Sequence, residues 1–230
     1  MPESIDRNEM GATPSQEACS SSSGWGGPRI VYATTLAMLL CAVVFRDGFS
    51  TEAARIYLRV SGRVALGLFF FSFGASAWHA MFRRPFTAAL IRNRRYVGIA
   101  TVVALYFHLS ALAGLALTDP VWRANEAPLY VTIPGGVTYL LVGLMGLTAN
   151  DASRRKLGAR AWKTLHIVGG YATLGAFLFE YILVAVLVPE YKETMWWSGS
   201  AYLFAAVPLT LLIARVGQAI GRRGAARLAR

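Results

Sequence analysis

Six long apolar segments, separated by polar and basic turns, dominate the hydrophobic pattern of the chain. They cover residues 30–45, 64–82, 96–118, 128–149, 164–188 and 200–221. Most have close to the roughly 20 residues that an α-helix needs to cross the hydrocarbon core of a bilayer. The pattern therefore predicts an all-α fold, a polytopic membrane helix bundle with six transmembrane helices over residues 29–221.

The two ends of the chain and the first loop have a different character. Residues 1–28 are polar and rich in Ser and Gly, which predicts a disordered tail, and residues 222–230 form a basic cytosolic tail. Residues 51–60 mix arginines with apolar positions. We expect them to form a short amphipathic helix on the outer interface, ahead of the second transmembrane helix.

Charge is distributed in a way that predicts orientation. The net charge is +11, while 55% of the residues are hydrophobic and the mean hydropathy is +0.45. The positive residues gather in alternate turns: Arg83, Arg84, Arg92, Arg94, Arg95, Arg154, Arg155, Lys156, Arg160, Lys163, Arg222, Arg223, Arg227 and Arg230. Basic turns mark the cytosolic side, so we expect a multi-pass protein of the cell (inner) membrane with both termini cytosolic. Nucleic-acid binding would instead favour one basic face on a soluble fold.

Few ionisable side chains lie within the predicted spans. They include the three histidines of the chain, His79, His108 and His166, and the acidic residue Glu180. Such groups are costly in lipid and usually face a partner or a cavity. Imidazoles on facing helices are axial ligands of haem iron, although a membrane histidine also forms hydrogen bonds between helices. Glycines and alanines beside His108 and His166 leave room for a flat ligand or for ordinary helix packing.

Two longer stretches carry a family resemblance. These are NRRYVGIATVVALYFHLSAL at 93–112 and GLTANDASRRKLGARAWKTLHIVGGY at 146–171, and STEAARIYLRVSGRVALGLFFF at 51–71 adds to them. Together they resemble the ferric-reductase-like transmembrane domain family. The chain is similar in particular to the haem-binding membrane subunit of the bacterial periplasmic methionine sulfoxide reductase system.

The resemblance implies a six-helix haem b protein that moves electrons across the membrane. It implies that His108 and His166 are ligands of the haem iron. It also implies that Arg94 and Arg95 contact a flavin such as FMN, or another electron donor, at the cytosolic face. The chain departs from the family at Phe179 and Glu180, where the family usually has a further histidine.

Helix geometry leaves the arrangement of these groups open. His108 and His166 are expected to differ in depth by roughly 10–15 Å, so a single haem held by both requires tilted helices or a shifted register. Alternatively, His79 pairs with His166 across an inner haem, or lies at the headgroup interface without a ligand role. If His79 and His166 hold an inner haem, Glu180 would stand opposite His108 as a weak ligand or as a proton-handling group.

The leading functional hypothesis is a membrane component of an oxidoreductase. Its electrons would come from a cytosolic-side flavin, flavoprotein or quinol and pass to an outer-side acceptor protein or small molecule, because no FAD or NAD(P)H module is expected in the chain. The lipid bilayer is the other expected partner, and no catalytic residue is assigned. The alternative is a haemless scaffold or a proton-coupled transporter derived from the same fold, in which Glu180 carries the proton.

Overall fold

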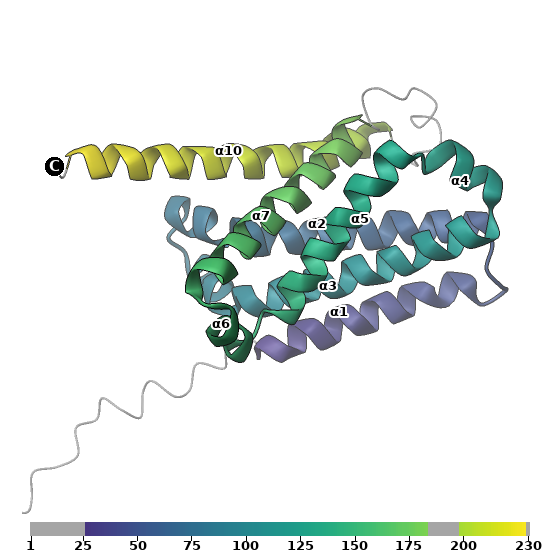
Figure 1. The fold of residues 1–230 in the computed structure, drawn as a ribbon, viewed down its shortest axis with the longest axis horizontal. Coiled ribbons are helices and arrows are strands. Elements are labelled where there is room, and N and C mark those ends of the chain that lie inside the picture. The colour runs from purple at the N-terminus through teal and green to yellow at the C-terminus, as the bar shows by residue number, and fades with distance from the viewer. Residues whose placement is uncertain (1–25, 184–197, 229–230) are drawn as a thin grey trace, which may run out of the picture.

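The computed structural model describes residues 26–183 and 198–228, and every regular element in these ranges is helical (Figure 1). The long helices are α1 (Gly27–Cys41), α2 (Thr51–Met81), α3 (Pro85–Thr118), α5 (Leu129–Leu147), α7 (Ala159–Leu178) and α10 (Ser198–Leu228). The short elements are η2 (Ala42–Phe45), α4 (Pro120–Glu126), α6 (Asp151–Leu157) and the π-helix η3 (Phe179–Leu183). The predicted all-α class is confirmed. Most of the predicted N-terminal tail lies outside the described residues.

Five helices in the described ranges are long and apolar enough to cross a membrane. They are Gly27–Phe45, Thr51–Met81, Pro85–Thr118, Leu129–Leu147 and Phe204–Gly221. The prediction of a multi-pass membrane protein is therefore confirmed. The predicted span 164–188 coincides with α7 and η3, but residues 184–188 lie outside the described part, and α7 begins with polar residues that lower its mean hydropathy.

The structure corrects the prediction for residues 51–60. They do not form a separate interfacial helix, because α2 is continuous from Thr51 to Met81. One side of its first turns packs against the other helices: Tyr57 is 3% exposed and its hydroxyl donates to the Met38 carbonyl of α1 at 3.2 Å. No proline interrupts the segment, so 31 residues form one helix of about 46 Å, longer than the hydrocarbon core.

α2 and α3 pack side by side and antiparallel over most of their length. Four polar pairs follow one another along this contact: Thr51 with Asp119 (2.8 Å), Ser61 with His108 (3.0 Å), the Ser72 carbonyl with Arg94 (2.9 Å) and His79 with Thr87 (3.0 Å). The pairs fix the register of the two helices. They also place His108 and His79 at opposite ends of the hairpin.

Asp119 closes the end of this hairpin where α2 begins and α3 ends. Its carboxylate caps α4 by accepting the Trp122 backbone N–H at 2.9 Å and also accepts the Thr51 hydroxyl. These bonds, first the one from Trp122 and then the one from Thr51, lower the pKa of Asp119 below its ordinary value. Trp122 packs against Ala54 and Leu115, so α4 is held down on the ends of α2 and α3.

The remaining helices cross this hairpin. α5 and α7 lie diagonally over α2 and α3, and α10 packs mainly against α2 and also contacts α7 (Figure 1). α10 continues well beyond the ends of α2 and α7 on the side of the C-terminus. The main core lies between α2, α7 and α10 and includes Leu66, Phe69, Leu174, Phe177 and Leu211.

Candidate functional site

His108 projects from α3 onto α2, where its ring is oriented by a serine. The Ser61 hydroxyl donates to the Tyr57 carbonyl at 2.7 Å, so its oxygen is left to accept a proton from His108 Nδ1 at 3.0 Å. This arrangement makes Nδ1 the protonated nitrogen and leaves the lone pair on Nε2. A histidine that ligates a metal has the same arrangement, with one nitrogen on the metal and the other held by a neighbouring group.

A glycine allows two polar side chains to meet beside this ring. A Cβ at Gly62 would lie 3.3 Å from His108 Cε1 and 3.8 Å from the Tyr181 hydroxyl oxygen. Both side chains therefore lie over the backbone of α2 at Gly62, from α3 and η3 respectively. The structure brings Tyr181 to His108, which sequence reasoning missed. The only sequence signal was its position next to Glu180.

The π-helix η3 sets the directions in which the side chains of Phe179, Glu180 and Tyr181 point. π-helical turns are rare and shift the side chains that follow relative to an α-helix. Glu180 lies where it acts electrostatically on Tyr139 of α5 and on Tyr181, and its side chain reaches the surface of the described residues. Phe179 is also partly exposed. Tyr181 therefore lies over Gly62 together with His108, and Glu180 lies near Tyr139 and Tyr181.

His166 lies near the N-terminal end of α7 and is oriented by Thr148 at the end of α5. The Thr148 hydroxyl donates to the Leu144 carbonyl at 2.6 Å, so it accepts from His166 Nε2 across a longer distance of 3.4 Å. The ring also packs on Trp162, with 4.2 Å between the ring centroids. The lone pair of His166 is therefore on Nδ1, the reverse of the arrangement at His108.

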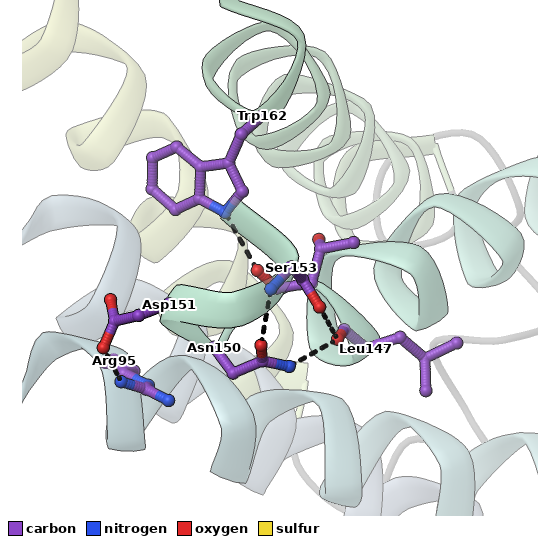
Figure 2. Close-up of polar contacts among 7 residues, drawn as sticks. Arg95, Leu147, Asn150, Asp151, Ser153 and Trp162 are labelled. Atoms are coloured by element: carbon purple, nitrogen blue, oxygen red, sulfur yellow. Dashed lines mark hydrogen bonds and ion pairs between the residues drawn. The ribbon is translucent and has the colours of Figure 1, made fainter. Parts of the chain in front are cut away.

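The turn that precedes His166 is a connected network of hydrogen bonds (Figure 2). Asn150 caps α6 by accepting the Ser153 N–H at 2.7 Å, and its amide donates to the Leu147 carbonyl at 3.1 Å. The Trp162 indole donates to the Thr148 carbonyl at 2.9 Å. The segment 147–162 thus folds back on itself and fixes the position from which α7 starts.

Gly158 makes the connection between α6 and α7. Its φ of +79° lies in the region that favours glycine, and it is the residue immediately before α7. Thr148, Asn150, Gly158, Trp162 and His166 are all part of the motif recognised in the sequence. The motif is therefore a scaffold for the first turns of α7, and His166 is the residue that it presents to the bundle.

His79 occupies a different kind of environment. The Thr87 hydroxyl donates to the Phe82 carbonyl at 2.6 Å and accepts from His79 Nδ1 at 3.0 Å, where α3 begins. His79 is five helical turns from Ser61, so both lie on the side of α2 that faces α3. The structure places the His79 ring against Thr87 of α3 and the His166 ring against Thr148 at the end of α5.

The depths of His108 and His166 can be compared along two paths. Through α5, Gly146 packs against Val102 of α3, and Thr148, two residues further along, contacts His166. Counted along α3, the level of His166 is then about eight residues, or ~12 Å, from His108. Through α2, Ser61 marks the level of His108, and Phe73 packs against Gly170, which lies one turn after His166. Counted along α2, the two histidines are then about 16 residues, or ~24 Å, apart. Axial ligands bind the same iron atom, so a single haem shared by these two histidines would depend on the tilt of α5 and α7 across α2 and α3.

Arg94 and Arg95 are directed to different places. Arg94 Nε donates to the Ser72 carbonyl inside the hairpin, whereas Arg95 Nη1 lies 3.4 Å from the Asp151 carboxylate at the start of α6 (Figure 2). Arg95 thus ties α3 to the turn between α5 and α7. Arg94 is the member of the pair that points toward the core.

The glycines of α7 admit neighbouring side chains. A Cβ at Gly169 would lie 2.3 Å from Met145 Sδ, and one at Gly170 would lie 2.5 Å from the Phe73 ring. The space over these glycines is therefore used for helix packing. From Phe73 a series of ring contacts continues through Phe69 (5.1 Å), Phe177 (5.5 Å) and Tyr181 (6.4 Å). It joins the level of Gly170, one turn above His166, to the level of His108.

The donors present suit a haem better than a closed metal site. Within residues 26–183 and 198–228, no three His, Cys, Asp or Glu side chains come together as a cluster that could hold a metal ion. A haem iron, however, needs a single buried imidazole nitrogen on one face. His108 offers one, with Nδ1 held by Ser61 and Nε2 unprotonated.

Comparison with known proteins gives one match. The family described as ferric reductase like transmembrane component matches residues 59–177, about half of the chain. The matched range contains all three histidines and the whole turn that presents His166. Neither a curated protein nor a solved structure matches the chain significantly.

Proposed function

Since the chain belongs to the ferric reductase like transmembrane component family and is a membrane electron-transfer component, we propose that it carries haem b and moves electrons from the cytosolic side to an outer-side acceptor. The haem-binding membrane subunit of the periplasmic methionine sulfoxide reductase system is the member whose role we extend to this chain. When bound, the haem would supply the one-electron carrier that amino-acid side chains lack.

The observation that carries the proposal is the state of His108. Its ring lies between α2 and α3 with Nδ1 bonded to Ser61, and this leaves Nε2 to bind iron. Gly62 keeps the backbone of α2 from obstructing the ring. Tyr181 lies at the same level and offers a hydroxyl as a neighbour to a group bound there. These residues form the outer half of the proposed path.

The inner half is assigned to His166 and Arg94. His166 is held by Thr148 and Trp162 near the cytosolic end of α7, where an electron from a flavin, a flavoprotein or a quinol would enter. Arg94 lies close enough to act electrostatically on His166 and would attract an anionic donor group. The ring contacts from Phe73 to Tyr181 fill the core between the level of His166 and the level of His108. Packed side chains therefore connect the two halves of the proposed electron path.

A second candidate function is favoured by Glu180. A carboxyl group at mid-membrane depth next to Tyr139 and Tyr181 suits proton movement, as in a haemless proton-coupled transporter. In the haem protein the same group would take up or release a proton when the charge near His108 changes. The two candidates therefore differ in whether haem is present and not in the role of Glu180.

The visible spectrum of the purified protein tests the proposal. After expression with sufficient haem and purification in detergent, we expect a reduced-minus-oxidised difference spectrum of the b type, because imidazole ligation produces it. Ser110→Ala, an exposed position two residues beyond His108, should leave this spectrum unchanged. A folded, colourless protein from the same preparation would reject the haem proposal in favour of the transporter.

The orientation of the chain has its own test. Basic residues concentrate around the start of α3, in and after α6, and at the C-terminus, so we expect the end at Arg230 to be cytosolic. A reporter enzyme that is active only outside the cytosol should be silent when fused after Arg230, and active when inserted at Gly48 in the loop between η2 and α2. Activity at Arg230 would reverse the proposed direction of electron flow.

A further inference from the structure

Two adjoining hollows lie at the cytosolic ends of α5, α6 and α7. The first, of about 350 Å³, is lined by Asp151, Arg154, Arg155, Gly158 and Ala159. The second, of about 790 Å³, continues from the same Gly158 and Ala159 along the outside of α7. Gly158 and Ala159 line both, so the two hollows adjoin and are treated together as one depression with a charged end and an apolar end.

The charged end has a strong excess of positive charge. Arg154, Arg155 and Arg160 border it, whereas its only carboxylate, Asp151, already pairs with Arg95 at 3.4 Å. The Arg154 guanidinium is placed by the Trp162 ring, 5.3 Å from the ring centroid. A ligand held at this end must therefore carry a negative charge.

The apolar end is lined by side chains that continue into the membrane. Leu141 of α5 and Leu165 and Val168 of α7 form its walls, with Thr164 near the charged end. Val168 is 50% exposed, so the protein itself does not cover this wall. A ligand that fills the whole depression must therefore have a long apolar part next to its negative head.

We infer that this depression binds one anionic phospholipid of the cytosolic leaflet, with its phosphate at Arg154, Arg155 and Arg160 and an acyl chain along Leu165 and Val168. Basic pockets between membrane helices at this depth are suited to anionic headgroups. A soluble acidic partner would use the arginines but would leave the apolar wall without an occupant. A quinone would fill the apolar wall but has no charge for the arginines to bind.

The site touches the proposed electron path without belonging to it. Leu165 and His166 are neighbours on α7, and Arg154 packs on the same Trp162 ring that supports His166. A bound lipid would therefore brace the start of α7. The inference does not depend on haem, and its test measures lipid alone.

Native mass spectrometry of the detergent-purified full chain tests the inference. On titration with phosphatidylglycerol we expect one tightly bound lipid, and with phosphatidylcholine none at the same concentration. The double variant Arg154→Gln/Arg155→Gln should weaken phosphatidylglycerol binding by about fivefold per removed charge. Val168→Asn should weaken it as well, through the acyl chain. Arg83→Gln/Arg92→Gln removes two exposed cytosolic arginines elsewhere and should have no effect.

Three outcomes would overturn the inference. Equal losses in the two arginine double variants would mean that the lipid responds only to the overall charge of the cytosolic face. Displacement of the lipid by millimolar inorganic phosphate would assign the charged end to a free anion. Displacement by a short-chain ubiquinone at equimolar concentration would assign the apolar end to a quinone.

Discussion

Replacing His108 by alanine is expected to remove nearly all of the absorbance that arises from haem in the outer half of the bundle. Alanine has no donor atom, and the structure places no second histidine at this level among the residues that it describes. Tyr181 is the nearest alternative, and its neutral hydroxyl is a much weaker ligand than an imidazole nitrogen. Haem content per protein, measured as the pyridine complex, should fall together with the difference spectrum.

Ser61→Ala provides the matched change on the neighbouring helix. It removes only the acceptor of His108 Nδ1–H, at 3.0 Å, and keeps the ligand itself. Loss of such a supporting hydrogen bond typically weakens binding by about 10- to 100-fold, so we expect partial haem loss and a shifted reduction potential. The assignment of His108 would be contradicted if His108→Ala kept the haem content and spectrum of the parent protein and Ser61→Ala also kept both.

His166→Ala is expected to have the second-largest effect, which is loss of the haem contribution from the cytosolic half. The turn of residues 147–162 presents this ring to the bundle, and Thr148 and Trp162 hold it there. No other histidine faces α5 at this depth in the described part of the chain. The measurement is haem content combined with the rate of reduction by a reduced flavin added to inside-out vesicles.

His79→Ala is the control for His166→Ala. It also removes an imidazole, but one that lies on α2. The His79 ring is bonded to Thr87 at the start of α3 and not to α5. We expect an unchanged spectrum in both oxidation states and no carbon monoxide adduct. A new carbon monoxide adduct in His79→Ala would instead show that His79 is a ligand, and the assignment of the inner half would have to be revised.

Much of the helical framework could be predicted from hydropathy, because each predicted apolar segment overlaps a helix over the residues that the structure describes. The boundary at residue 51 could not be predicted in this way. The arginines of residues 51–60 resemble an interfacial helix in sequence, but tertiary packing decides the outcome, since Tyr57 and Ala54 are buried against α1 and α4. The hydrophobic and charged pattern of one segment contains no information about its contacts with distant segments.

The candidate site was predictable in composition but not in arrangement. Three histidines and Glu180 stand out in an apolar sequence because each is costly in lipid. Which nitrogen of each ring is protonated depends on Ser61, Thr87 and Thr148, which are eight to 47 residues away from their histidines. Tyr181 was missed because only the π-helical turn brings it to Gly62.

The antiparallel pairing of α2 and α3 also bears on how the protein enters the membrane. A polar side chain that enters lipid alone carries the full cost of desolvation, whereas one whose partner is on the next helix enters already satisfied. The partners of His108 and Arg94 are both on α2, and only the three residues 82–84 separate α2 from α3. The two helices can therefore be inserted as one hairpin during biosynthesis, with their polar groups bonded before α5, α7 and α10 arrive.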